Sequence, residues 1–162
     1  MHRLPTGMGL TYRRTTLSRF FTLLEAEALL PQIDSHLRRL IELKNLHEQI
    51  DGSINEIHHR ISLSGGMIPP RGELLELRRR KAETARDLKA TVDSIHSTGC
   101  QIKDIDSGLI DFPTLYHGKE VLLCWKLGEE GISFWHRVED GFQGRRSIDS
   151  EFLSNHRGGS TQ

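Results

Sequence analysis

Net charge, cysteine and long apolar runs are all scarce in this sequence of 162 residues. The 22 basic and 22 acidic residues cancel, so no overall field favours nucleic acid or an anionic membrane. The two cysteines, Cys100 and Cys124, stand alone and fit no close metal-ligand spacing, so we expect free thiols, no bound metal and no cofactor. Short apolar runs argue against a transmembrane helix and a signal peptide. These features predict a cytoplasmic protein that binds neither nucleic acid nor membrane.

The two ends of the chain lack the regular apolar spacing of a packed domain. Residues 1–19 hold four arginines, no acidic residue and no amphipathic stripe, which predicts a disordered basic extension. A targeting or nucleic-acid-binding arm is the alternative. Residues 149–162 are expected to form a polar tail. The remainder, residues 20–148, is predicted to be a single α+β domain.

The first part of this domain has helical spacing. Thr22 and Glu25 are placed for a capping box, and Pro31 is expected to end or kink the first short helix just before it. After the proline, apolar residues recur at an average spacing of about 3.5, the heptad seam of a helix that packs on a partner helix. The seam consists of Ile33, Leu37, Leu40, Leu43, Leu46, Ile50, Ile54, Ile57 and Ile61.

A second helix is expected over residues 73–98, after a glycine- and proline-rich connection at residues 65–72. Gly99 stands where a glycine commonly ends a helix. Four basic residues at 78–81 have acidic neighbours at ion-pair spacing, which indicates a solvated face. The predicted seam of this helix is Leu74, Leu77, Ala85, Leu88, Val92 and Ile95. Together the two helices predict a long antiparallel, coiled-coil-like hairpin over residues 22–98.

From Cys100 onward the apolar period changes to two, which predicts a small antiparallel β-meander over residues 100–148, packed beside the hairpin. In "GKEVLLCWKL" one strand face carries Val121, Leu123, Trp125 and Leu127. In "ISFWHRV" one face carries Ile132, Phe134, His136 and Val138. The burial of Trp125 requires an acceptor for its indole N–H.

Several motifs resemble the prokaryotic family catalogued as domain of unknown function 2203. They are "FFTLLEAEALLP", "GLIDFP", "LLCWKLGE", "FWH" and "GFQGR", and the resemblance spans about residues 20–148. It implies that residues 1–19 are an extension, and it implies no reaction. Members of the family often carry an acidic residue directly after the histidine of "WH", whereas this chain has Arg137.

Four polar residues near these motifs are candidates for a ligand-binding site: Asp111, Glu129, His136 and Arg145. His136 is a general base or ligand between apolar neighbours, or a histidine bonded at the sheet margin. Asp111 either caps the turn before Phe112-Pro113 or belongs to a site. Arg145 follows Gly141 and Gly144 and is placed to bind an anion, or to bridge Asp111 or Glu129 structurally. The glycine pattern lacks the lysine and hydroxyl of a phosphate loop.

Two hypotheses about function follow from the sequence. The first is a protein–protein interaction or self-association module that forms a homodimer through the helical hairpin, because the seam is too long for the small meander to cover. The second is a ligand-binding or hydrolytic protein with a polar site around Asp111, His136 and Arg145. Convergence of these three side chains around an open cavity would favour the second hypothesis, and pairing without a cavity would favour the first.

Overall fold

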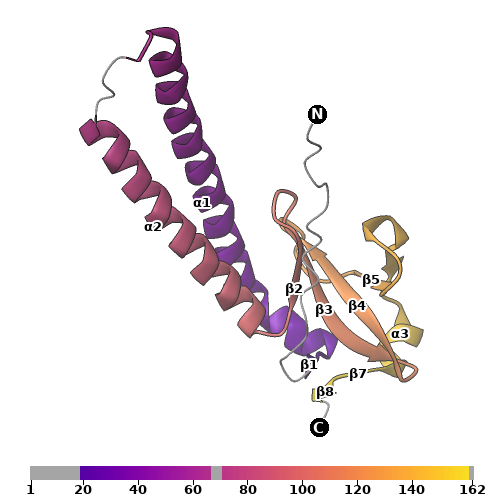
Figure 1. Ribbon diagram of the computed structural model, residues 1–162. Coiled ribbons are helices and arrows are strands. Elements are labelled where there is room, and N and C mark those ends of the chain that lie inside the picture. Colours follow the sequence, from indigo (N-terminus) through magenta and orange to yellow (C-terminus); the bar gives the residue numbers. More distant parts are fainter. Residues whose placement is uncertain (1–18, 67–70, 161–162) are drawn as a thin grey trace.

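The computed structural model describes residues 19–66 and 71–160, which form a long helical hairpin and an antiparallel sheet beside its base (Figure 1). The α+β class expected from the sequence is confirmed. The expected disordered extension lies outside the described residues, apart from Arg19, which begins strand β1. Within the described ranges, none of the helices combines the length and apolar character that a membrane crossing needs.

Helices α1 (Leu23–Leu63) and α2 (Arg71–Ser97) form the predicted hairpin. The capping box is present at the start of α1. The Glu25 amide donates to Thr22 Oγ1 at 3.2 Å, and the Thr22 amide donates to Glu25 Oε2 at 2.8 Å. After α2, Gly99 adopts the left-handed conformation, with φ of 97°, that the expected helix end requires.

The expected helix end at Pro31 is wrong, because α1 continues through the proline to Leu63. Pro31 is exposed, whereas Leu30 and Ile33 beside it are buried in the core shared with the sheet. Their burial holds the helical backbone on both sides of the proline. This tertiary packing outweighs the cost of an interior proline, which is about 3 kcal/mol.

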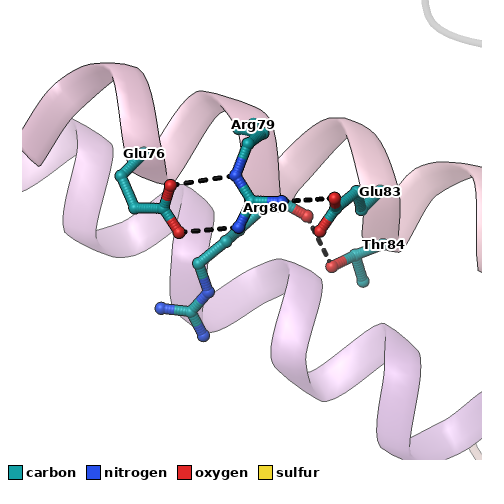
Figure 2. Close-up of polar contacts among 5 residues, drawn as sticks. All are labelled: Glu76, Arg79, Arg80, Glu83 and Thr84. Atoms are coloured by element: carbon teal, nitrogen blue, oxygen red, sulfur yellow. Dashed lines mark hydrogen bonds and ion pairs between the residues drawn. The ribbon is translucent and has the colours of Figure 1, made fainter.

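The heptad seam of α1 is confirmed, since Leu46 and Ile61 are half-buried and the other seam residues are buried. On α2 the predicted seam is wrong at one position: Ala85 is exposed, and Thr84 is only 6% exposed. The heptad continues through positions 77, 81, 84 and 88, so position 85 falls outside it. Thr84 tolerates burial because its hydroxyl donates to the Arg80 carbonyl at 2.7 Å, as Figure 2 shows.

Ion pairs occupy the stretch of α2 in which the apolar seam lapses. Arg79 binds both carboxylate oxygens of Glu76, at 2.9 and 2.8 Å, and also pairs with Glu83 (Figure 2). These side chains are about half exposed, which is the solvated face that the sequence indicated. Lys81 instead reaches across the hairpin and pairs with Asp51 of α1.

The sheet is an antiparallel meander in which consecutive strands are neighbours. Its strands are β2 (Gln101–Asp104), β3 (Leu109–Tyr116), β4 (Lys119–Lys126), β5 (Phe134–Arg137) and, after the short helix η1 (Phe142–Gly144), β6 (Arg146–Ser147). His117 and Gly118 form the β3–β4 turn, with φ values of 50° and 74°. Positive φ at both residues is the requirement of a two-residue type I′ turn.

One face of the sheet packs on the base of the hairpin and forms the core. Val121, Leu123 and Trp125 lie there, as predicted. The prediction for the next strand is wrong, because β5 contains neither Ile132, which is buried in this core, nor Val138, which is 55% exposed. The Ile132 amide donates to Oε1 of Glu27 on α1 at 3.3 Å. This bond ties the loop to the helix and takes Ile132 out of the strand alternation.

The C-terminal segment is not the polar tail expected from the sequence. It forms α3 (Ser150–Asn155), β7 (His156–Arg157), which pairs with β3, and β8 (Gly159–Ser160), which pairs with β1 (Arg19–Phe20). Phe152 of α3 is 1% exposed, and its ring stacks on Tyr116 and Trp135 at centroid distances of 4.9 and 5.1 Å. The burial of Phe152 and the two strand pairings together dock the segment on the domain.

Candidate functional site

Asp111 and His136 meet on the sheet face that points away from the hairpin. Asp111 alternates along β3 with the core residues Ile110 and Phe112, so its side chain points to the opposite face. His136 lies on β5, two strands away, and its Nε2 atom is 3.0 Å from Asp111 Oδ2. The residues are only 1% and 4% exposed, respectively. Two of the four predicted site residues are thus a buried, directly bonded pair.

The backbone fixes the orientation of the His136 ring. Nδ1 lies 2.8 Å from the carbonyl oxygen of Arg137. A carbonyl only accepts hydrogen bonds, so Nδ1 must carry a proton and donate it. Nε2 is therefore the ring atom available to Asp111.

Glu129 and Arg145 form a second pair. Two guanidinium nitrogens of Arg145 donate to the two carboxylate oxygens of Glu129, each at 2.7 Å, and one also donates to the Cys124 carbonyl at 3.2 Å. The guanidinium stacks on the rings of Phe134 and Phe142, at 4.3 and 4.6 Å. Partial burial opposes ionisation of Glu129, but its bonds with Arg145 and the Lys126 amide hold its pKa below the usual value.

Cys124 links the two pairs. It was not among the site residues expected from the sequence. It lies directly opposite Asp111 in the β3–β4 register, and it is 1% exposed. Burial raises the pKa of its thiol to about 11, with a further contribution from the Asp111 charge. The signal that identifies Cys124 is the two-residue turn at His117-Gly118, because counting back from this turn pairs Asp111 with Cys124.

Among the described residues, one group of side chains could hold a metal ion: Asp111, Cys124 and His136. One ligand atom from each residue lies within 4.8 Å of the others. No metal was expected from the sequence, because Cys100 and Cys124 stand alone and fit no close metal-ligand spacing. The three residues come together only through the sheet.

Two surface cavities lie near these residues but do not contain the buried pair. One, of about 520 Å³, lies between α1 and the β4–β5 loop and is lined in part by Trp125 and Glu129. The other, of about 320 Å³, lies between the β3–β4 turn and the C-terminal segment. Asp111, His136 and Arg145 line neither cavity. The predicted residues therefore form two hydrogen-bonded pairs, and of these four residues only Glu129 lines one of the two cavities.

Comparison with known protein families gives a match over most of the chain. A family model described as an uncharacterized conserved protein, DUF2203, matches residues 19–148, which is most of the chain. This range holds the hairpin, the meander and all the candidate site residues. Neither a curated protein nor a solved structure matches the chain.

Proposed function

Since the chain belongs to this uncharacterized conserved family, DUF2203, whose description names no activity, we propose its function from its own geometry. We propose that it is a protein–protein interaction module that self-associates through the helical hairpin. The observation that carries the proposal is that much of the hairpin projects beyond the sheet as an arm (Figure 1). We define the arm as residues 45–63 of α1 and 71–87 of α2.

The arm takes no part in the hydrophobic core between the sheet and the base of the hairpin. The hydrophobic core uses α1 residues only as far as Ile41 and α2 residues only from Leu88. Next along α1, Lys44 pairs with Asp106 in the β2–β3 turn at 2.5 Å. A two-helix arm without tertiary support gains its stability from one narrow seam, so its length serves a purpose other than covering the sheet.

The surface of the arm offers apolar contacts at its tip and along its edges. Ile50 is 3% exposed, so the middle of the seam is closed within one chain. Leu46 is only half-buried, and so is Leu88 just below the arm. At the tip, Leu63 and Leu75 are 75% and 65% exposed. A partner that covers these leucines would bury apolar area worth about 25 cal/mol per Å².

A second copy of the chain is the proposed partner. Two hairpins packed side by side make a four-helix, coiled-coil-like bundle, the common solution for helices whose apolar edges are only half covered. The proposed homodimer works in the cytoplasm, where a reducing environment keeps thiols such as the buried, unpaired Cys100 and Cys124 free.

Light scattering coupled to gel filtration tests this proposal. At micromolar concentration the parent chain is expected at twice its 18.5 kDa mass. The double variant Leu63→Glu/Leu75→Glu places charge at the tip and is expected to be monomeric. Leu24→Glu is the matched control, because Leu24 is 78% exposed at the opposite end of the hairpin. A parent that elutes as a monomer at high micromolar concentration contradicts the proposal.

The alternative, a ligand-binding or hydrolytic site around Asp111, His136 and Arg145, has one favourable observation. The His136–Asp111 pair is almost fully buried, and such a polar pair costs free energy that an apolar pair would not. Against this alternative, Arg145 is bound to Glu129 rather than aimed at either cavity. The interaction module therefore remains the leading proposal.

A further inference from the structure

We propose that Asp111, Cys124 and His136 form a three-ligand site for a divalent transition metal ion of the zinc type. The three residues come from the adjacent strands β3, β4 and β5 and share one face of the sheet. Their exposed fractions are 1%, 1% and 4%. The site is distinct from the arm, so its test is independent of the self-association proposal.

The tautomer of His136 favours a cation between His136 and Asp111. Its Nδ1–H donates to the Arg137 carbonyl, so a neutral ring presents a lone pair at Nε2. This lone pair faces Asp111 Oδ2 at 3.0 Å. Two acceptors at that distance need a cation between them, which is either a proton or a metal ion. Donation of the other ring N–H to a backbone carbonyl is also the usual outer-shell arrangement of a metal-binding histidine.

The carboxylate of Asp111 has one unpartnered oxygen. Asp111 Oδ1 is buried and has no hydrogen-bond partner. A buried carboxylate oxygen without a partner costs free energy, and native structures contain few of them. A metal ion that binds Asp111 would neutralise this carboxylate and remove the cost. A proton shared between Asp111 and His136 satisfies Oδ2, and the Cys124 thiol, which also hydrogen-bonds to the Asp111 carboxylate, is only a weak donor.

The donor atoms indicate which ion fits. A thiolate, an imidazole nitrogen and a carboxylate oxygen suit zinc and its neighbours in the transition series, whereas calcium and magnesium prefer oxygen ligands alone. Two ligands that each bind zinc at about 2.0 Å in a tetrahedron lie about 3.3 Å apart, so Nε2 and Oδ2, at 3.0 Å, need to separate only slightly to admit the ion. Three protein ligands leave one position of the tetrahedron for water or another ligand.

The charges near the site allow a cation to enter. Arg145 is neutralised by its bidentate contact with Glu129. Lys103 Nζ lies 4.0 Å from Asp111 Oδ2, but its side chain is 45% exposed, so the contact is weak and the ammonium group is free to move into solvent. Displacement of Lys103 opens the carboxylate to an ion from that side.

Titration of the metal-free full-length protein with Co²⁺ and Zn²⁺ tests the proposal. We expect one equivalent of Co²⁺ to give the visible bands of a tetrahedral ion together with a thiolate-to-cobalt charge-transfer band, and Zn²⁺ to displace it. The variants Cys124→Ala, Asp111→Asn and His136→Gln should weaken Zn²⁺ binding by more than the roughly 10–100-fold expected for loss of an outer-shell partner. Cys100→Ala is the matched control, since it removes the other buried thiol and should leave affinity and spectrum unchanged.

Circular dichroism of each variant shows that it has folded before its affinity is compared. Should Cys124→Ala not fold, the charge-transfer band of the parent and of Cys100→Ala still decides the question, because Cys124 is then the sole remaining thiol. A tetrahedral cobalt spectrum without that band would overturn the proposal. Zn²⁺ binding that is not weakened by loss of Cys124 would also overturn it, since Cys124 would then not be a ligand. No binding at all would show that a proton alone bridges His136 and Asp111.

Discussion

The indole of Trp125 donates from Nε1 to the backbone carbonyl of Glu129 at 3.0 Å. Glu129 also accepts from the Lys126 amide at 2.9 Å through its side chain, and the same carboxylate holds Arg145. One loop residue thus satisfies the buried tryptophan with its backbone and positions the arginine with its carboxylate. The packing of the core and the polar pair on the loop are therefore linked through Glu129.

We predict that Trp125→Ala lowers the free energy of unfolding by roughly 3–5 kcal/mol, the range for loss of a large buried aromatic. Trp125 is 3% exposed and belongs to the core, so its removal leaves a cavity and also frees the Glu129 carbonyl. Urea denaturation followed by circular dichroism measures the change. Val138→Ala is the control, because Val138 is 55% exposed and should change stability by less than about 0.5 kcal/mol. A Trp125 variant as stable as the parent would contradict the packing described for β4.

The Arg145–Glu129 pair is predicted to contribute about 1–2 kcal/mol of coupling free energy, as expected for charge-assisted hydrogen bonds with both partners largely buried. A double-mutant cycle with Arg145→Ala and Glu129→Ala, read by thermal or urea unfolding, measures it. The exposed pair Lys89–Asp93, whose side chains are 78% and 60% exposed, is the reference and should give a clearly smaller coupling free energy, because solvent screens it. Equal coupling free energies in the two cycles would show that partial burial does not strengthen the Arg145–Glu129 pair.

The hairpin was predictable because heptad spacing is a local property of the sequence, and so was the face of β4 that carries Trp125. Errors arose where tertiary contacts override a local rule. Burial of Leu30 and Ile33 keeps the helix intact through Pro31. The hydroxyl of Thr84 is satisfied by its own helix, so a polar residue lies in the seam.

The candidate site shows the same limit. Asp111, Glu129, His136 and Arg145 are polar residues beside glycines and aromatics, so the sequence could single them out. It could not show that they form two separate pairs, because each pair depends on strand register or on the path of the β4–β5 loop. Cys124 was missed because a cysteine in an apolar strand resembles any other core residue. Only its cross-strand neighbour, Asp111, places it beside a polar group.

Phe152→Ala is predicted to destabilise the protein by roughly 3–5 kcal/mol, because its ring is 1% exposed and stacks on Tyr116 and Trp135. Leu153→Ala is a neighbouring control, since Leu153 is 47% exposed and its truncation should be close to neutral. Differential scanning calorimetry compares the two variants with the parent. Equal melting temperatures for all three proteins would mean that the C-terminal segment contributes nothing to the fold.

The thiol of Cys100 should make stability depend on pH in the alkaline range. Burial raises its pKa from 9.0 to about 11, and its thiol lies 3.4 Å from the Ile95 carbonyl, to which it donates. Between these pH values the unfolded chain has lost the thiol proton and the folded chain has kept it, so the unfolded state binds fewer protons and stability falls as pH rises. The contribution is fully present below about pH 9 and lost by about pH 11. Its size is roughly 3 kcal/mol, from a pKa rise of about two at about 1.4 kcal/mol per pKa unit.

The measurement is urea denaturation of the parent and of Cys100→Ala at a series of pH values from about 8 to about 11, the window set by the two pKa values. The parent should lose more stability than the variant across this window, while groups such as Lys44 and Tyr116, which also titrate at alkaline pH, are common to both proteins and cancel in the difference. Cys100→Ala will be less stable than the parent at neutral pH, because it removes a buried side chain, so the test lies in how the difference changes with pH. A constant difference would show that the Cys100 thiol ionises equally easily in the folded and unfolded chain, and that its burial is not maintained in solution.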